Sequence, residues 1–202
     1  MGKYTGPVCR LCRTEQKKLF LKGDRCKSEK CPLNRKRGAP GKDPKGRTGK
    51  RSEYGLQLRE KQKLKRMYCM LEKQFRLTFD KAQRMPGITG DNLIGLLESR
   101  LDNVAYRMHF ASSRAQARQL VSHGHILVNG KVVDISSFTV KPADVIEVKE
   151  NSKKFVVILD ALKEVSKSGT VSWIDLDIDA QKGTFVSYPR RADVTDLTDI
   201  KE

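Results

Sequence analysis

The 202-residue sequence has few aromatic residues and no long apolar run. Hydrophobic residues make up 38% and aromatic residues 6%, whereas an average globular chain is about 45–50% apolar. No stretch of 18 apolar residues occurs, which excludes a membrane-spanning helix. Residues 1–18 are polar and basic, so we expect no secretory signal. These absences predict a cytoplasmic protein with a modest core and no membrane partner.

Acidic residues are scarce in the first third of the chain. The whole sequence has 41 Lys and Arg against 24 Asp and Glu, a net charge of +17. Residues 1–66 hold 22 Lys and Arg against 6 Asp and Glu, which is +16, while residues 67–150 carry +2 and residues 151–202 carry −1. A basic segment this concentrated is typical of a surface that binds a phosphate backbone. A solvated basic face or an unstructured tail is the alternative.

Cysteine is limited to five residues, an odd number that disfavours a disulfide framework in a chain without an export signal. Cys9 and Cys12 are spaced C-x2-C, and Cys26 and Cys31 are spaced C-x4-C. Two such pairs close a tetrahedral thiolate site, which zinc prefers. We predict one structural zinc ion in a loop-built knuckle, because zinc binding of about 10–16 kcal/mol orders segments with few apolar residues. Four unrelated thiols or a redox pair are the alternatives.

Residues 34–51 read NRKRGAPGKDPKGRTGKR, with four Gly, two Pro and eight Lys or Arg. This composition predicts an extended basic strap along a nucleic acid, or a flexible linker. From Ser52 onward, apolar residues recur every three or four positions to Phe79. The period predicts one long helix that ends at Met85-Pro86-Gly87, with Cys69 inside it as a small buried hydrophobe. Its other side faces phosphate or solvent.

The segment 91–150 predicts two helices followed by a small antiparallel sheet. One helix covers 91–108, and Ser113-x-x-Gln116 is a capping box for the next. Asn129-Gly130 between apolar residues is a strong hairpin signal, and Val140 and Val145–Val148 supply further strands. Metal binding by His123 and His125 is disfavoured because no third ligand is close in sequence. A phosphate or base contact and a plain turn role remain open for these histidines.

The last part of the chain predicts a helix over 155–167 and then a strand. Trp173, Leu176 and Ile178 are interspersed with Asp175, Asp177 and Asp179. A calcium loop is disfavoured because apolar residues lie between the acids and the required Gly is missing. A half-exposed strand with an acidic face fits better.

Three stretches carry a resemblance to a known family. RLDNVAYRMHFASSRAQARQLVSHGHILVNGKVV (100–133) closely resembles the signature of the S4 family of RNA-binding modules. EYGLQLREKQKLKRMY (53–68) resembles the long-helix segment of the small-subunit ribosomal members of that family. The basic cysteine module resembles the zinc-binding bacterial variants. The three stretches occur in the family's order over nearly the whole chain.

The resemblance implies an α+β fold in four segments. They are a zinc knuckle and strap (1–45), a helical RNA-binding domain (46–90), an inserted S4-type module (91–158) and a C-terminal helix and strand region (159–202). It also implies binding to 16S ribosomal RNA at a helix junction in the 5′ domain, where such proteins organise the subunit body. The implied protein partner is ribosomal protein S5, with messenger RNA near the entry channel. Effects on decoding accuracy and repression of the protein's own operon are further implications.

The resemblance and the charge pattern select candidate RNA-binding residues in three groups. In the S4-type module they are Arg114, Gln116, Arg118, Gln119, His123 and Lys131. On the long helix they are Tyr54, Gln57, Lys61, Lys63 and Arg66. In the basic N-terminal part they are Arg10, Arg13, Lys22, Lys30, Arg35, Lys36, Arg37, Lys50 and Arg51.

Two other classes of protein fit the sequence less well. RNA-modifying enzymes and synthetases with an S4-type module need a separate catalytic domain, but only about fifty residues follow the module here. No phosphate loop or nucleophile–base pair occurs, so we expect neither catalysis nor a small-molecule substrate. A zinc-finger DNA-binding regulator would need a His pair after the cysteines, or a recognition helix repeated in a dimer.

Overall fold

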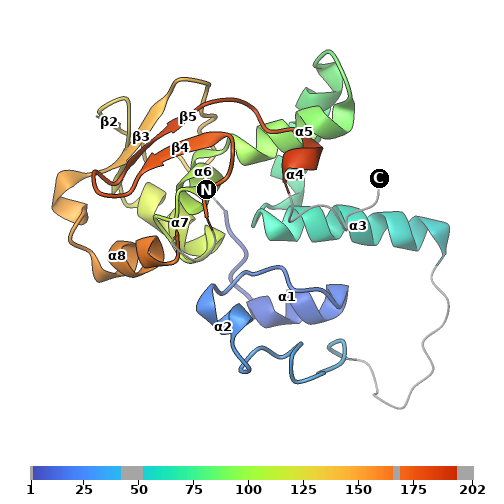
Figure 1. The fold of residues 1–202 in the computed structure, drawn as a ribbon. Coiled ribbons are helices and arrows are strands. Elements are labelled where there is room, and N and C mark those ends of the chain that lie inside the picture. The colour runs from blue at the N-terminus through green and yellow to red at the C-terminus, as the bar shows by residue number, and fades with distance from the viewer. Residues whose placement is uncertain (1, 42–51, 166–168, 195–202) are drawn as a thin grey trace. The chain divides into compact units, whose positions relative to one another are not determined.

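A computed structural model describes residues 2–41, 52–165 and 169–194 (Figure 1). The chain divides into two compact units, one within residues 1–77 and the other within residues 78–195. Within the described residues, no helix combines the length and the apolar character that a membrane crossing requires. We describe each unit by itself.

The first unit places the cysteine pairs on helices as well as turns. Helix α1 spans Val8–Glu15 and the short helix α2 spans Asp24–Lys27. Cys9 and Cys12 therefore lie three positions apart on α1, a spacing that puts both side chains on one face. The predicted loop-built knuckle is corrected in this respect, because half of the cysteine module is helical. The interior of the cysteine module includes Leu19 and Leu21, which are buried.

The predicted long helix is two helices. Helix α3 spans Glu53–Met67 and α4 spans Glu72–Arg84. The predicted start is confirmed, since Ser52 is the N-cap and its hydroxyl accepts a hydrogen bond from the Gly55 amide at 3.2 Å. The break falls at Cys69, whose φ of 53° is left-handed, and the turn buries Tyr68 and Met70 on either side of it. Cys69 itself is half-buried in this turn, outside either helix.

The second unit begins within α4 and continues with helices α5 (Thr89–Glu98), α6 (Leu101–Arg107) and α7 (Arg114–Ser122). The predicted helix over 91–108 is therefore interrupted after Glu98. The Val140 amide donates to the Ser99 carbonyl at 2.8 Å, and the Leu101 amide donates to the Phe138 carbonyl at 2.9 Å. The interruption exists because this stretch pairs with a segment about 40 residues away in sequence, a β-ladder-type pairing that a helical backbone excludes.

A five-stranded antiparallel sheet completes the second unit. Its strands are β1 (Ile126–Val128), β2 (Lys131–Val132), β3 (Val145–Val148), β4 (Ile174–Asp177) and β5 (Lys182–Phe185), in the order β2-β1-β3-β5-β4. The predicted hairpin is confirmed, with Asn129 and Gly130 at φ of 50° and 76°. Strands β4 and β5 show that the C-terminal region belongs to the same sheet as the S4-type module.

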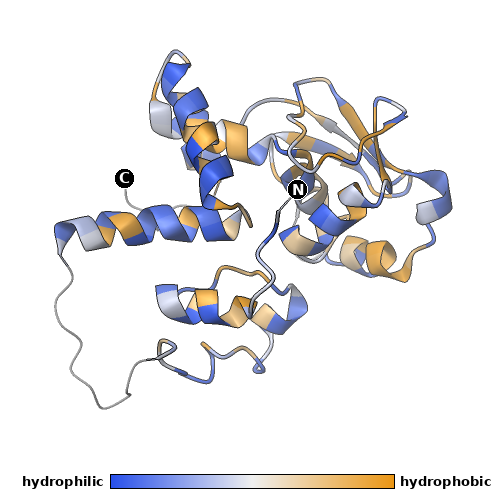
Figure 2. Cartoon of the chain, turned by 180° about the vertical axis from the view of Figure 1, so that it is seen from behind, coloured by the Kyte–Doolittle hydropathy of each residue, from blue (hydrophilic) through white to orange (hydrophobic). Residues whose placement is uncertain are grey.

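Helices pack against this sheet to form the core. Met108, after the end of α6, contacts Gly183 of β5 so closely that a Cβ at Gly183 would lie 3.0 Å from its Cε. Fully buried side chains come from helices, from strands and from the turn after α6. Examples are Leu97, Leu101 and Ile158 on helices, Ile126, Ile146 and Phe185 on strands, and Phe110 in the turn. Helix α8 spans Val156–Lys163, and short 3-10 turns lie at Glu150–Ser152 and Arg191–Asp193. Figure 2 shows that α8 is mostly hydrophobic and α3 mostly hydrophilic.

The acidic strand is confirmed at the edge of the sheet. In β4, Ile174 is buried while Asp175 and Asp177 are exposed. Charged residues on an edge strand hinder further strand pairing. The alternation therefore marks a solvated edge, in agreement with the sequence prediction.

Candidate nucleic-acid interface

The four paired cysteines line one small pocket in the first unit. Cys9, Cys12, Cys26 and Cys31 share its walls with Arg25, Pro32 and Leu33. Burial raises the pKa of both the Cys12 and the Cys26 thiol, and the charges of the neighbouring thiolates raise each further. The Lys22 amide donates to Cys26 Sγ at 3.3 Å. Elements separated by a loop thus bring four sulfur atoms to one place.

The chemistry of this donor set fits a soft metal ion such as zinc. Thiolate ligands are commonly oriented by amide donors like that of Lys22. Across the described ranges, however, no three or more His, Cys, Asp or Glu side chains form a ready metal-binding group. The structure records no disulfide among the five cysteines, all of which lie in the described residues. The zinc ion stays a prediction.

Most candidate cations of the cysteine module lie on its surface. Arg13 is half-buried and its Nη1 donates to the Gly38 carbonyl at 3.4 Å, while Arg35 is exposed and its Nε donates to the Glu29 carbonyl at 3.2 Å. The remaining exposed members are Arg10, Lys22, Lys30, Lys36 and Arg37. We call these seven residues the N-terminal cation array. Lys50 and Arg51 lie outside the described residues.

Helix α3 presents a second set of candidates. Tyr54 is 72% exposed and Gln57 is exposed. Lys61 pairs with Glu72, and Lys63 pairs with Glu60 at 2.6 Å. Exposed ion pairs are worth only about 0–1 kcal/mol. An RNA phosphate can therefore replace Glu72 as the partner of Lys61 at small cost.

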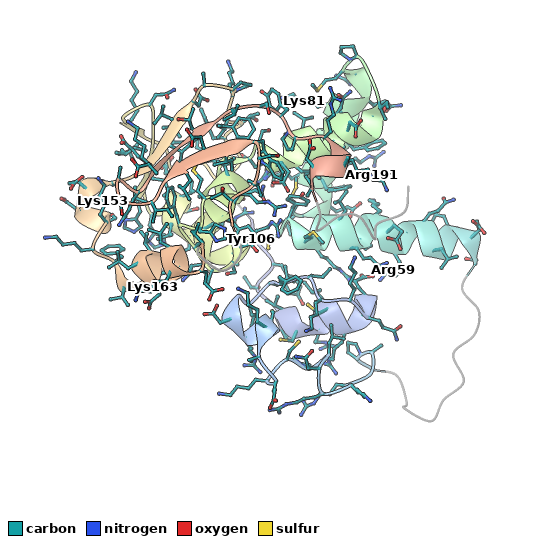
Figure 3. The ribbon with its side chains drawn as sticks, in the orientation of Figure 1. Arg59, Lys81, Tyr106, Lys153, Lys163 and Arg191 are labelled. Carbon is teal, nitrogen blue, oxygen red and sulfur yellow. The ribbon has the colours of Figure 1, made fainter. Side chains whose placement is uncertain are left out.

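The remaining α3 candidate, Arg66, has a partner inside the first unit. Arg66 and Arg59, the latter labelled in Figure 3, both pair with Glu15, at 3.3 Å for Arg59, and the Glu15 side chain is fully buried. This contact fastens α1 to α3 and directs Arg66 toward protein. Glu15 was not among the residues predicted from sequence, although its position as the single acid within residues 1–23 was a signal.

In α7, the candidate RNA-binding residues Arg114 and Arg118 are buried instead of lying on the surface. Each residue is only 6% exposed. Arg114 Nε donates to Asn103 Oδ1 at 2.7 Å, and its guanidinium lies 4.6 Å from the ring centre of Tyr106, labelled in Figure 3. Arg118 Nη1 lies 3.9 Å from Asp102 Oδ2. Both arginines therefore have partners within the helical part of the module.

Glu98 is the centre of this internal polar network, and the sequence analysis missed it. Its side chain is fully buried and accepts from Arg107 Nε and Nη2 at 2.9 and 2.8 Å. Asn103 Nδ2 donates to the same carboxylate at 2.7 Å and thereby links Glu98 to Arg114. Charged residues within an otherwise apolar helical pattern were the available signal.

Three of the candidate RNA-binding residues in the S4-type module lie on the surface. Gln119, His123 and Lys131 are exposed. Gln116 is half-buried, and its Oε1 accepts from both the amide and the hydroxyl of Ser112 at 2.8 Å. Ser113 caps α7 as predicted, by accepting from the Gln116 amide, while the Gln116 side chain turns to Ser112 instead of completing the box.

Comparison with known proteins places both parts of the chain in one family. Residues 3–98 match the family described as ribosomal protein S4/S9 N-terminal domain, and residues 99–146 match the S4 domain. The chain is 57% identical over 195 residues to small ribosomal subunit protein uS4 of Syntrophotalea carbinolica, covering 96% of this chain and 93% of that protein.

Two further relatives with the same name are similar over their full extent. The uS4 protein of Pelobacter propionicus is 55% identical over 202 residues, and that of Kosmotoga olearia is 53% identical over 201 residues. Each alignment covers 100% of this chain and 96% of the relative. The chain therefore belongs to the bacterial small ribosomal subunit protein uS4 family, whose members are structural proteins of the ribosome and not enzymes.

Proposed function

We propose that this chain binds 16S ribosomal RNA directly as a structural constituent of the small ribosomal subunit. The observation that carries the proposal is the N-terminal cation array, which the fold leaves largely on the surface of the segment with a net charge of +16. Clustered exposed cations bind phosphates through counterion release, without a requirement for base sequence. The exposed part of α3 adds Tyr54 and Gln57 to this surface.

The proposal extends to assembly of the subunit. A strongly basic segment beside a separately folded RNA-binding module can hold several RNA helices at one junction, as we propose for the 5′ domain of the 16S RNA. Such a protein would bind early and organise the subunit body. Membership of the uS4 family supports the binding of ribosomal RNA. We further propose that the chain contacts ribosomal protein S5 and messenger RNA near the entry channel, influences translational accuracy and represses its own operon.

The cysteine pocket supports a structural role for zinc. We assign Cys9, Cys12, Cys26 and Cys31 to one zinc ion, because they share a pocket and thiolates are zinc ligands of choice. The ion would hold α1, α2 and the cation array in a fixed arrangement. It supplies folding free energy and no reaction.

Crosslinking and sequencing of RNA bound to this chain in its own cells, with gradient sedimentation, tests the RNA assignment. We expect crosslinks in the 5′ domain of 16S RNA and sedimentation with the small subunit. Crosslinks confined to transfer RNA or to scattered messengers would contradict the assignment.

Metal analysis of a double variant, Cys9→Ser with Cys12→Ser, tests the zinc assignment. We expect about one zinc per chain in the unmodified protein and none in the variant, since two of four ligands are lost. Amide exchange in the second unit should be unchanged. Cys69→Ser is the matched control and should keep its zinc. A double variant with a full complement of zinc would overturn the assignment.

A further inference from the structure

Three aromatic side chains form a cluster on the second unit. The rings of His123 and His125 are offset-stacked, with centroids 6.1 Å apart and an interplanar angle of 17°. Phe155 meets His125 edge-on at 5.1 Å and 72°. His123 is exposed and Phe155 is 41% exposed, so the cluster opens to solvent at the His123 end.

The backbone holds the cluster in place. Gly124 takes a left-handed φ of 71°, and a Cβ there would lie 3.3 Å from Val132 Cγ1. His125 Nδ1 lies 3.0 Å from Ser152 Oγ, and the His125 carbonyl accepts from the Lys149 amide at 2.9 Å. The Ser152 contact to the ring and the Lys149 contact to the backbone thus hold His125 at the end of the pairing where β1 begins and β3 ends. A fixed ring loses little entropy when a ligand stacks next to it.

The electrostatic surroundings favour a base over a phosphate. Burial lowers the pKa of His125, and His123 and Lys149 lower it further, so its ring is uncharged at neutral pH. His123 is the C-cap of α7, where the partial negative charge of the helix end opposes a bound anion. Lys149 is exposed and Lys153, labelled in Figure 3, pairs with Glu150 at 2.8 Å. Aromatic rings with a lysine nearby suit a nucleotide whose base stacks while its phosphate meets the cation.

We propose that His123, backed by His125 and Phe155, stacks on an unpaired nucleobase of the bound RNA. This inference rests on the proposed RNA-binding function and specifies the ligand class at one point of its surface. His123 was a candidate from sequence for either a phosphate or a base contact. His125 and Phe155 enter only through the fold, which brings residues 30 positions apart into one cluster.

Three substitutions at one position separate stacking from charge. His123→Phe supplies an uncharged ring, His123→Lys supplies a cation without a ring, and His123→Ala has neither a ring nor a charge. With protein-free 16S ribosomal RNA from the same cells as the probe, we expect His123→Phe to bind like the unmodified chain. His123→Lys and His123→Ala should bind about 5- to 150-fold more weakly, since one base stack is worth about 1–3 kcal/mol. The salt dependence of the Phe and Ala variants should not change.

Phe155→Ala should weaken binding less than His123→Ala, because Phe155 only supports the stack. Val157→Ala is the control, since Val157 is 45% exposed on α8 and outside the cluster. Amide exchange in β1 verifies that each variant is folded. Strong binding by His123→Lys, with weak binding and a shallower salt slope for His123→Phe, would overturn stacking in favour of a phosphate contact. Unchanged binding by all three His123 variants would also overturn it. If the unmodified chain failed to bind the RNA, the proposed function itself would fall.

Discussion

Buried charged side chains in the second unit are paired with one another and have little contact with solvent. The Glu98 carboxylate is fully buried and is satisfied by Arg107 and Asn103 at 2.7–2.9 Å. Removing one partner of a buried pair leaves an uncompensated charge and costs about 3–5 kcal/mol. The same residue types on the surface contribute far less. Burial, which sequence does not report, therefore decides whether an arginine holds the fold together or binds RNA.

Arg107→Ala should destabilise the second unit by about 3–5 kcal/mol, because Glu98 would keep its charge without its bidentate partner. Trp173 is the sole tryptophan, is 3% exposed and lies under the Arg107 guanidinium, so its fluorescence reports unfolding in urea. Lys163→Ala is the control, since its pair with Asp160 is exposed, and should shift stability by about 0–1 kcal/mol. Similar shifts for both variants would refute the role of Glu98.

The Arg114→Ala and Lys131→Ala variants should differ in how steeply their RNA binding depends on salt concentration. Arg114→Ala should lower stability but leave the salt slope of RNA binding unchanged, because its guanidinium is buried against Asn103 and Tyr106. Lys131→Ala should reduce the slope by about 0.7–0.9, the value for one lost phosphate contact. Filter binding between low and physiological salt measures both slopes. A reduced slope for Arg114→Ala would show that the arginine leaves its buried position to meet RNA.

At the scale of elements, contacts distant in sequence determine where helices stop. The apolar period runs on through Cys69 and through Ser99, yet both positions are breaks. At Ser99 the break follows from pairing with Val140. In the first unit, Glu15 links α1 and α3 through Arg59 and Arg66. Local pattern identifies the helices, while such contacts set their ends and their partners.

Glu15→Gln should loosen the attachment of α1 to α3. The amide keeps the shape of the side chain but leaves Arg59 and Arg66 without a carboxylate. We expect amide exchange in both helices to quicken at least about tenfold, which corresponds to 1.4 kcal/mol. Glu72→Gln is the control, because Glu72 pairs with Lys61 and Lys65 at the surface, and should have a smaller effect. Equal exchange in both variants would argue against Glu15 as the link.

At the scale of the whole molecule, the positive charge and most of the folded core lie in different parts of the chain. The first third of the chain carries +16, and the rest is close to neutral. The sheet and most of the buried core lie in the second unit. We therefore expect electrostatic affinity to come chiefly from the first unit, and shape and base contacts to come from the second.

Neutralising three cations in each unit tests this division. Replacement of Arg35, Lys36 and Arg37 by Gln should reduce the salt slope of 16S RNA binding by about 2–3, since each lost phosphate contact removes about 0.7–0.9. The matched triple replaces the exposed residues Lys141, Lys154 and Lys182 of the second unit. It should change the slope by less than one such contact. Equal losses from both triples would disprove the division.

Features that depend only on residues close together in the sequence were determined by the sequence alone. They include the Asn129-Gly130 hairpin, the Ser52 and Ser113 caps, the acidic edge strand, the concentration of charge, and the S4-type order of segments. The tertiary structure alone decided that Arg114 is buried, that Glu15 joins two helices, and that Phe155 meets His125. Each of these depends on contacts between distant parts of the chain, and the burial and charge compensation that such contacts create leave no periodic trace in the sequence.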